Sequence, residues 1–327
     1  MIGRYLVTGA LVVQGVVAMA GEPFRVEIVS SPAHVPLGIP ADLMVRAENV
    51  SGAPVPVAFN RPPLSVQVQS DSGTEIHCPF CTGRWGVVRR LLPANWRYVE
   101  NVVVPLKEVG RYSLQAVLKH HWNMDKKPAE YPDIWWGRSL SQPVKVEIVE
   151  PQGIDREAYE WSGHDPLGDS ERYGELLGRF PTSTYAAYVV WQRWGRVTAG
   201  GWKSASDRDT FLSWLAGDPD EEYLTWNLPC THDGRIDSSV TTRLGGRKAL
   251  ECRDQWLELV LASHPDIWFA DEVRLRLALD RYRLGDREAC AAGLEALAAH
   301  GRPYVASKAG ELLAAMRAEG MLPGEGG

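Results

Sequence analysis

The stretch that decides the fold of the first half is Gly110-Arg111-Tyr112-Ser113-Leu114-Gln115-Ala116-Val117-Leu118. From Tyr112 onward, Leu114, Ala116 and Leu118 take every second position. A period of two places one set of side chains in a core and the other set on the opposite face of a strand. Gly110 precedes the alternation and is typical of a turn. The stretch therefore predicts a half-buried strand that begins directly after a turn.

The same alternation recurs on both sides of this stretch. It is clearest at Phe24–Ile28 and Val144–Ile148. Shorter candidate strands lie between them at Asp42–Glu48, Val55–Phe59, Leu64–Gln69, Val87–Leu92 and Tyr98–Val104. Turn-rich segments separate these strands, and no helical period intervenes. Many short strands in such a length of chain predict a β-sandwich.

Residues Gly110 to Leu114 resemble the tyrosine corner of immunoglobulin-like domains. In that family, a tyrosine at the start of a late strand donates its hydroxyl hydrogen to the backbone a few residues upstream. The Cys-Trp-Cys pattern of antibody domains is absent. The resemblance is therefore to the broad immunoglobulin-like class, and it covers residues 22–150.

The pattern changes after Glu150, where Pro and Gly in the segment 151–153 predict a linker. Beyond it the apolar residues follow a helical period, as at Cys290, Gly293, Leu294 and Leu297. Gly285 predicts a helix end, and Asp286 predicts the N-cap of the next helix. The sequence thus predicts an α+β protein of two domains, with a helical domain over residues 154–320.

The helical half contains a degenerate repeat. His264–Ala270 matches Phe180–Ala186 in form, and a weaker copy lies at Pro303–Ala306. Residues 264–316 resemble the tetratricopeptide repeats of exported bacterial envelope proteins, and residues 155–194 resemble a more divergent copy. This resemblance implies a scaffold that presents surfaces to other proteins. An irregular insert at residues 195–246, with one short helix at Asp207–Leu215, predicts either a binding loop or a stapled loop.

The N-terminus has the order of a secretory signal peptide. Arg4 precedes a mostly apolar run, and Ala18-Met19-Ala20 supplies small residues at both recognition positions of a cleavage site. The alternative is an N-terminal anchor helix, although the run is short for a membrane span. The prediction is a signal peptide at residues 1–20, export to the bacterial periplasm or extracellular space, and no membrane span in the mature chain.

Composition excludes some partners. The 327-residue chain is 45% hydrophobic and carries a formal net charge of −6. This is a globular composition without a general attraction to nucleic acid or anionic lipid, so neither is an expected partner. The sequence does not decide the oligomeric state.

Export changes how the five cysteines are interpreted. His77-Cys78-Pro79-Phe80-Cys81 contains a C-x-x-C pair, which predicts a disulfide in a loop. The alternatives are a metal site completed by His77, His120 and His121, or redox-active thiols. Cys230 and Cys252 flank part of the insert and predict a second disulfide, with two unpaired thiols as the alternative. Cys290 is expected to be buried in helix packing.

Aromatic residues offer the remaining candidate site. Trp135 and Trp136 lie in a proline-rich stretch between the last two predicted strands. Exposed aromatics on a loop can stack on sugars or grip a peptide, whereas the alternative is that they cover the end of the sandwich or the domain interface.

No common nucleotide, phosphate, metalloprotease or hydrolase signature is present. We therefore expect a non-catalytic binding or scaffold protein with no cofactor and a protein partner. A metal- or thiol-dependent site at the end of the sandwich is the second hypothesis. Inhibition of an extracellular peptidase by a sandwich loop is the third.

Overall fold

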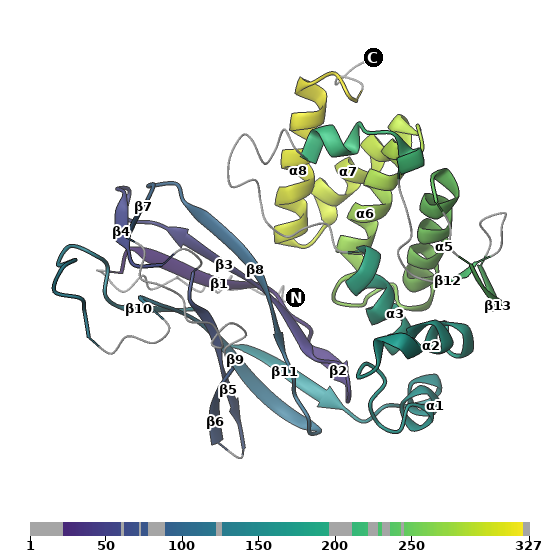
Figure 1. The fold of residues 1–327 in the computed structure, drawn as a ribbon, viewed down its shortest axis with the longest axis horizontal. Helices are drawn as coiled ribbons and strands as arrows, with labels where there is room; N and C mark the ends of the chain where they lie inside the picture. The colour runs from purple at the N-terminus through teal and green to yellow at the C-terminus, as the bar shows by residue number, and fades with distance from the viewer. Residues whose placement is uncertain are drawn as a thin grey trace, which may run out of the picture.

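A computed structural model gives the chain a β-rich first half and a helical second half (Figure 1). It describes residues 22–59, 62–71, 73–77, 89–121, 126–195, 211–221, 228–230, 236–242 and 245–322. Residues 76–77, 170, 221, 228–230 and 236–242 are described by their backbone alone. The predicted signal peptide at residues 1–20 and the Cys78 and Cys81 pair lie outside the described residues.

Two sheets form the first half. The first sheet is antiparallel and has the order β1 (Phe24–Ser30), β3 (Ala41–Asn49), β8 (Arg97–Val104). The second sheet has the order β2 (His34–Pro36), β11 (Val144–Val149), β9 (Gly110–Lys119), β5 (Leu64–Ser70), β6 (Gly73–His77), with β10 (Arg138–Leu140) also paired to β9. A separate ribbon joins β4 (Val55–Val57) to β7 (Arg90–Leu92). Only the β2–β11 pair is parallel among the described strand pairs.

Alternation explains how the two sheets pack. On β3 the side chains of Leu43 and Val45 are fully buried, and on β9 so are those of Leu114 and Leu118. These residues belong to one hydrophobic cluster that fills the space between the sheets. The predicted sandwich is confirmed, and its strand order resembles that of immunoglobulin-like domains. The strands β2, β6 and β10 were not predicted.

The tyrosine corner is present in this sandwich. The hydroxyl of Tyr112 donates a hydrogen bond to the backbone oxygen of Glu108, at 2.8 Å. Tyr112 lies near the start of β9, which Gly110 opens directly after the bend at Glu108 and Val109. The bond ties the bend to the strand that follows it, as the resemblance implied.

The second half is helical. Its α-helices are α1 (Ile154–Trp161), α2 (Tyr173–Arg179), α3 (Thr184–Val190), α5 (Arg247–Ser263), α6 (Ala270–Arg283), α7 (Arg287–His300) and α8 (Pro303–Ala318). The last three pack in succession, and Asp286 caps α7 by accepting a hydrogen bond from the Ala289 backbone N–H, as predicted. Among the described residues, none of the helices combines the length and the apolar character that crossing a membrane requires.

Two parts of the helical half differ from the sequence expectation. The segment that resembles a divergent repeat, residues 155–194, contains three short α-helices and the 3-10 turn η1 (Ser170–Arg172). A π-helical turn, η2 (Trp191–Gly195), follows α3. The insert at residues 195–246 holds regular structure, because β12 (Leu228–Cys230) and β13 (Ile236–Thr242) pair as a ribbon. Residues 211–215 are helical, within the predicted short helix.

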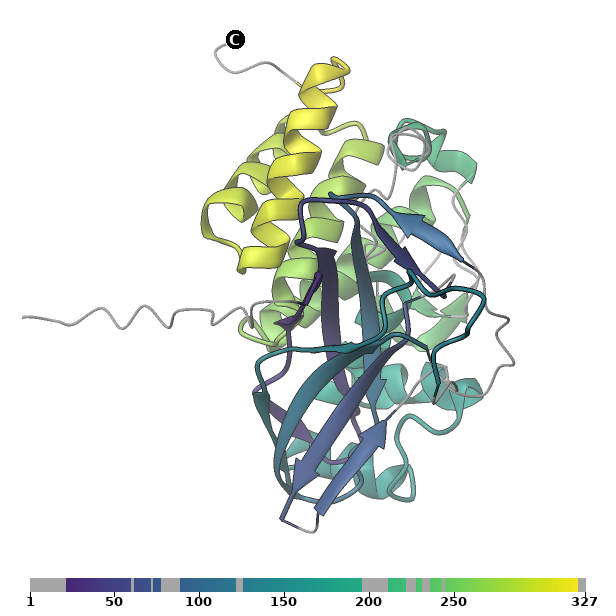
Figure 2. The ribbon, with the colours of Figure 1, turned by 90° about the vertical axis from the view of Figure 1, so that its left-hand side faces the viewer.

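The helices cover the outer face of the first sheet. The β3 residues Asp42 and Met44 point away from the sandwich core, yet both are buried. Tyr188 of α3 and Gln192 of η2 donate hydrogen bonds to Asp42 Oδ2 at 3.3 and 2.7 Å. Tyr185 donates to the Leu37 oxygen at 2.5 Å. One hydrophobic cluster runs through both halves, which lie one behind the other in Figure 2.

Candidate functional site

Strand register decides which predicted site residues share one end of the sandwich. Leu64 of β5 pairs with Leu118 of β9, and Val66 of β5 pairs with His77 of β6. The final residues of β6 and β9 therefore lie at the same end of the second sheet. Had β5 led directly into the C-x-x-C loop, the loop would have begun at the opposite end. The unpredicted strand β6 reverses the chain and brings His77 back to the end where His120 and His121 follow β9.

His120 is fixed by a carbonyl and an aromatic ring. Its backbone N–H donates to the Gly137 oxygen at 3.0 Å, and its ring Nδ1 lies 3.1 Å from the same oxygen. A carbonyl oxygen only accepts, so Nδ1 carries hydrogen and Nε2 carries the lone pair when the ring is neutral. Trp136 stacks on this imidazole with ring centroids 3.6 Å apart. The two rings form one aromatic unit, which we call the His120–Trp136 stack.

His121 lies beneath the surface, with 7% of its area exposed. Burial lowers the pKa of this imidazole, and the neighbouring His120 lowers it further. Both effects disfavour the cationic form, so His121 is neutral at pH values where an exposed histidine is partly charged.

Trp135 has a structural role at the same end of the sandwich. Its backbone N–H donates to the Pro56 oxygen at 2.7 Å, and its Nε1 donates to Glu22 Oε2 at 3.1 Å. Its ring meets Phe24 edge to face, with centroids 4.8 Å apart. Trp135 therefore packs against the sandwich core, which is the covering role that the sequence offered as an alternative. Trp136 is half-buried and packs on His120 instead.

Three of the five cysteines, Cys230, Cys252 and Cys290, lie within the described residues. Cys78 and Cys81 lie outside the described residues, and in the described part of the chain no group of three potential metal ligands is present. Cys252 is buried in α5 and is disulfide-bonded. Cys230 ends β12, where only the backbone is described, so its pairing with Cys252 stays a prediction. Cys290 is free and fully buried as expected, and burial raises the pKa of its thiol to about 12.

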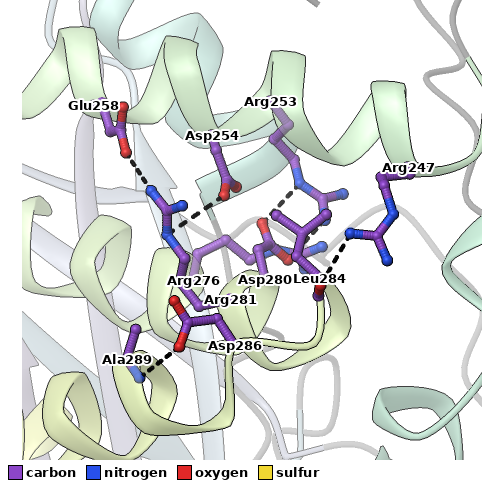
Figure 3. Close-up of polar contacts among 10 residues, drawn as sticks. All are labelled: Arg247, Arg253, Asp254, Glu258, Arg276, Asp280, Arg281, Leu284, Asp286 and Ala289. Carbon is purple, nitrogen blue, oxygen red and sulfur yellow. Dashed lines mark hydrogen bonds and ion pairs between the residues drawn. The ribbon is translucent and has the colours of Figure 1, made fainter.

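Sequence reasoning missed a buried charge cluster between α5 and α6 (Figure 3). Arg253 grips the Asp280 carboxylate with two hydrogen bonds, from Nε at 2.9 Å and from Nη2 at 2.7 Å. Arg276 Nε lies 3.1 Å from Asp280 Oδ1, one turn away on the same helix. Asp280 is fully buried, and Arg253 is 3% exposed. The i,i+4 spacing of Arg276 and Asp280 was a signal in the sequence, although this spacing is typical of exposed helix faces.

A second carboxyl group lies in the charge cluster. Asp254 follows Arg253 on α5 and is 4% exposed, and the nearest contact to a described cation is Arg281 Nε at 4.0 Å. Arg281 bonds Glu258 at 2.5 Å. Desolvation and the adjacent Asp280 raise the pKa of Asp254 to about 8.

Comparisons with known proteins find similar solved structures but no matching family. No protein-family model matches, and no curated protein matches. A CARDB domain from Pyrococcus furiosus, solved with two metal ions, is similar over 39% of this chain and 93% of its own, at 16% identity and a TM-score of 0.23. A β-glucosidase from Listeria innocua is similar over 38% of this chain and 16% of its own, at 13% identity and a TM-score of 0.23.

Proposed function

We propose that this chain is a non-catalytic binding protein and that the end of the sandwich is its contact surface for a protein partner. The His120–Trp136 stack carries this proposal. Its rings are fixed by the Gly137 oxygen and by each other before any partner arrives. Fixed aromatic side chains lose little conformational freedom on binding, and tryptophan is enriched among the residues that dominate interface energies.

The position of the helices supports the same surface. They cover the outer face of the first sheet, where Asp42 and Met44 are buried. That face is therefore occupied within the chain. On the second sheet, β10 pairs with the last residues of β9 and lies apart from the helices in Figure 1.

The proposal includes export and a repeat-like scaffold. Cleavage after Ala20 would release the chain into the periplasm or the extracellular space. Mass spectrometry of the exported protein should find a mature N-terminus at Gly21, and a soluble exported chain that keeps residues 1–20 would contradict this. The successive packing of α6, α7 and α8 supports a tetratricopeptide-like helical domain.

Photo-crosslinking tests the contact surface. A photoreactive amino acid replaces Trp136 in the full chain, expressed in its native host. The control carries the same amino acid at Val109, which is 45% exposed and lies before β9 at the opposite end of the sandwich. We expect a discrete protein adduct from position 136 and none of that mass from position 109. No adduct at 136, or the same adduct at both positions, would overturn the proposal.

A metal- or thiol-dependent site is the second candidate at the same end. The register of β5, β6 and β9 favours it, because it brings His77, which precedes the C-x-x-C pair in sequence, to the end that carries His120 and His121. A neutral imidazole is the form that binds zinc, and His121 is held neutral. Elemental analysis of the purified protein separates the two candidates. The binding proposal expects no stoichiometric metal, whereas zinc that is lost in His121→Ala would favour the second candidate.

A further inference from the structure

The carboxyl groups of Asp254 and Asp280 come from different helices and both lie buried inside the charge cluster (Figure 3). Asp280 is engaged by Arg253 and Arg276, so it holds its negative charge. Asp254 has only a long ion pair, from its Oδ2 to Arg281 Nε at 4.0 Å. Neither of its buried oxygens accepts a hydrogen bond from any donor in the described part of the chain. After the loss of hydration, the Asp280 carboxylate is the group that raises the pKa of Asp254 most.

Two ionised carboxylates are both acceptors and have no hydrogen to place between them. A hydrogen bond between them therefore requires one proton. Because the arginines hold Asp280 as the anion, the proton belongs on Asp254. The alternative is two negative charges side by side in a region where each aspartate is almost completely removed from water. Such pairs share a proton rather than ionise together.

We propose that a proton held between Asp254 and Asp280 joins α5 to α6 and makes the packing of these two helices sensitive to pH. When the proton leaves, the hydrogen bond is lost and two buried carboxylates repel each other. The helices must then separate locally, or water must enter between them. Acid conditions favour the joined form, and alkaline conditions weaken it.

The surrounding charges are consistent with this device. From α5 and α6, the charged groups acting on Asp254 are Arg253, Arg281 and Asp280. Arg276 and Glu258 act through their pairs with Asp280 and Arg281. Other elements also pack on α5. Of these, α3 carries no charged residue, and η2 contributes Arg193, which lies 6.0 Å from the ring centroid of Tyr173.

The remaining element described with side chains is η3 (Pro219–Glu221). Its Asp220 lies beside Gly246, about two helical turns before Asp254. The charged side chain of β13 is Asp237, for which the backbone alone is described.

The sign of the pH effect follows from linkage. An aspartate in the unfolded chain has a pKa near 3.9, whereas that of Asp254 in the folded chain is raised to about 8. Between these values the folded state holds a proton that the unfolded state has released. The free energy of unfolding therefore falls as pH rises through this window. Above the window, the contribution of Asp254 to it no longer changes with pH.

The test compares the melting temperature of the full chain from about pH 5 to about pH 9. Asp254→Asn keeps a donor to Asp280 without a titrating proton. The matched control is Glu258→Gln, one turn along α5, which breaks the exposed pair with Arg281 and leaves both aspartates intact. We expect the melting temperatures of the wild type and the control to fall toward high pH. The melting temperature of Asp254→Asn should fall distinctly less over the same range. An equal loss in all three proteins would overturn the proposal.

A direct titration covers the case in which Asp254→Asn does not fold. Carbon-13 NMR of the labelled aspartate carboxyl groups follows Asp254 in the wild type. We expect the signal of Asp254 to be that of the protonated acid at neutral and acid pH. The signal should change to that of the carboxylate only at alkaline pH. A transition near pH 4 would show an ionised Asp254 at neutral pH and would contradict the shared proton.

Discussion

At the scale of single residues, the burial of charge is the most consequential feature of the helical half. Asp280 is fully enclosed and receives two hydrogen bonds from Arg253. A buried ion pair is a weak source of net stability, because both partners lose their hydration. Removing one partner is costly, however, because the other charge stays buried without compensation.

Asp280→Ala should therefore lower the free energy of unfolding by about 3 kcal/mol or more, since Arg253 would keep its charge in the interior. The matched control is Glu295→Ala, which removes the partner of Arg317 in a pair whose glutamate side chain is 51% exposed. The control should cost less than about 1 kcal/mol. Urea unfolding of both variants measures the difference, and equal losses would show that the charge cluster does not behave as a buried pair.

At the scale of elements, close helix approach depends on a glycine. Gly293 of α7 faces α6, and a Cβ atom built on it would lie 2.9 Å from Cβ of Ala278. Gly310 of α8 has room, because its nearest neighbour would be Cβ of Ala298 at 4.0 Å. Alanine raises helix propensity by about 1 kcal/mol at both positions, so propensity alone predicts the same gain for both.

We expect alanine to change the melting temperature in opposite directions at Gly293 and Gly310. Gly310→Ala should raise the melting temperature through helix propensity. Gly293→Ala should lower it, because α6 and α7 must move apart to admit the methyl group. Thermal unfolding followed by circular dichroism at 222 nm measures both. A gain in stability at both positions would contradict the close approach of α6 and α7.

Elements also show what the sequence could and could not predict. Strands with one buried face, such as β9 and β11, followed from alternation alone. β3 was also found, although its outer face is buried by helices that no local pattern indicates. β6 was missed because Gly73–His77 lies at the edge of its sheet, where alternation is weak. This omission also left the placement of the His77 segment undecided.

At the end of the sandwich, sequence patterns identified the candidate residues but not the different contacts that each of them makes. The neighbours Trp135 and Trp136 look equivalent in sequence, yet one packs on Phe24 and the other stacks on His120. The charge cluster was not predicted, because Arg253 and Asp280 are far apart in sequence. Such pairing depends on tertiary packing of α5 on α6, which a single sequence does not display.

At the scale of the whole molecule, the two halves are joined by buried hydrogen bonds as well as apolar contacts. Asp42 is 4% exposed and accepts hydrogen bonds from Tyr188 and Gln192. Its replacement by alanine would leave those donors without this acceptor. Each buried polar group that loses its partner costs about 1–3 kcal/mol.

Asp42→Ala should therefore lower the stability of the sandwich and the helices together. Hydrogen exchange with mass spectrometry, read separately for β9 and α5, measures the two halves in one experiment. We expect faster global exchange in both, because they share one hydrophobic cluster. Faster exchange in β9 with unchanged protection of α5 would show that the halves unfold independently.

In our proposal, the end of the sandwich binds a protein through the His120–Trp136 stack. The most direct measurement is the affinity of the partner trapped at position 136, titrated against wild type, Trp136→Ala and the control Val109→Ala. Because aromatic anchors dominate interface energies, Trp136→Ala should weaken binding by about tenfold or more, a loss of about 1.4 kcal/mol. Val109→Ala should bind as the wild type does. Equal affinity of all three proteins would contradict binding through the His120–Trp136 stack.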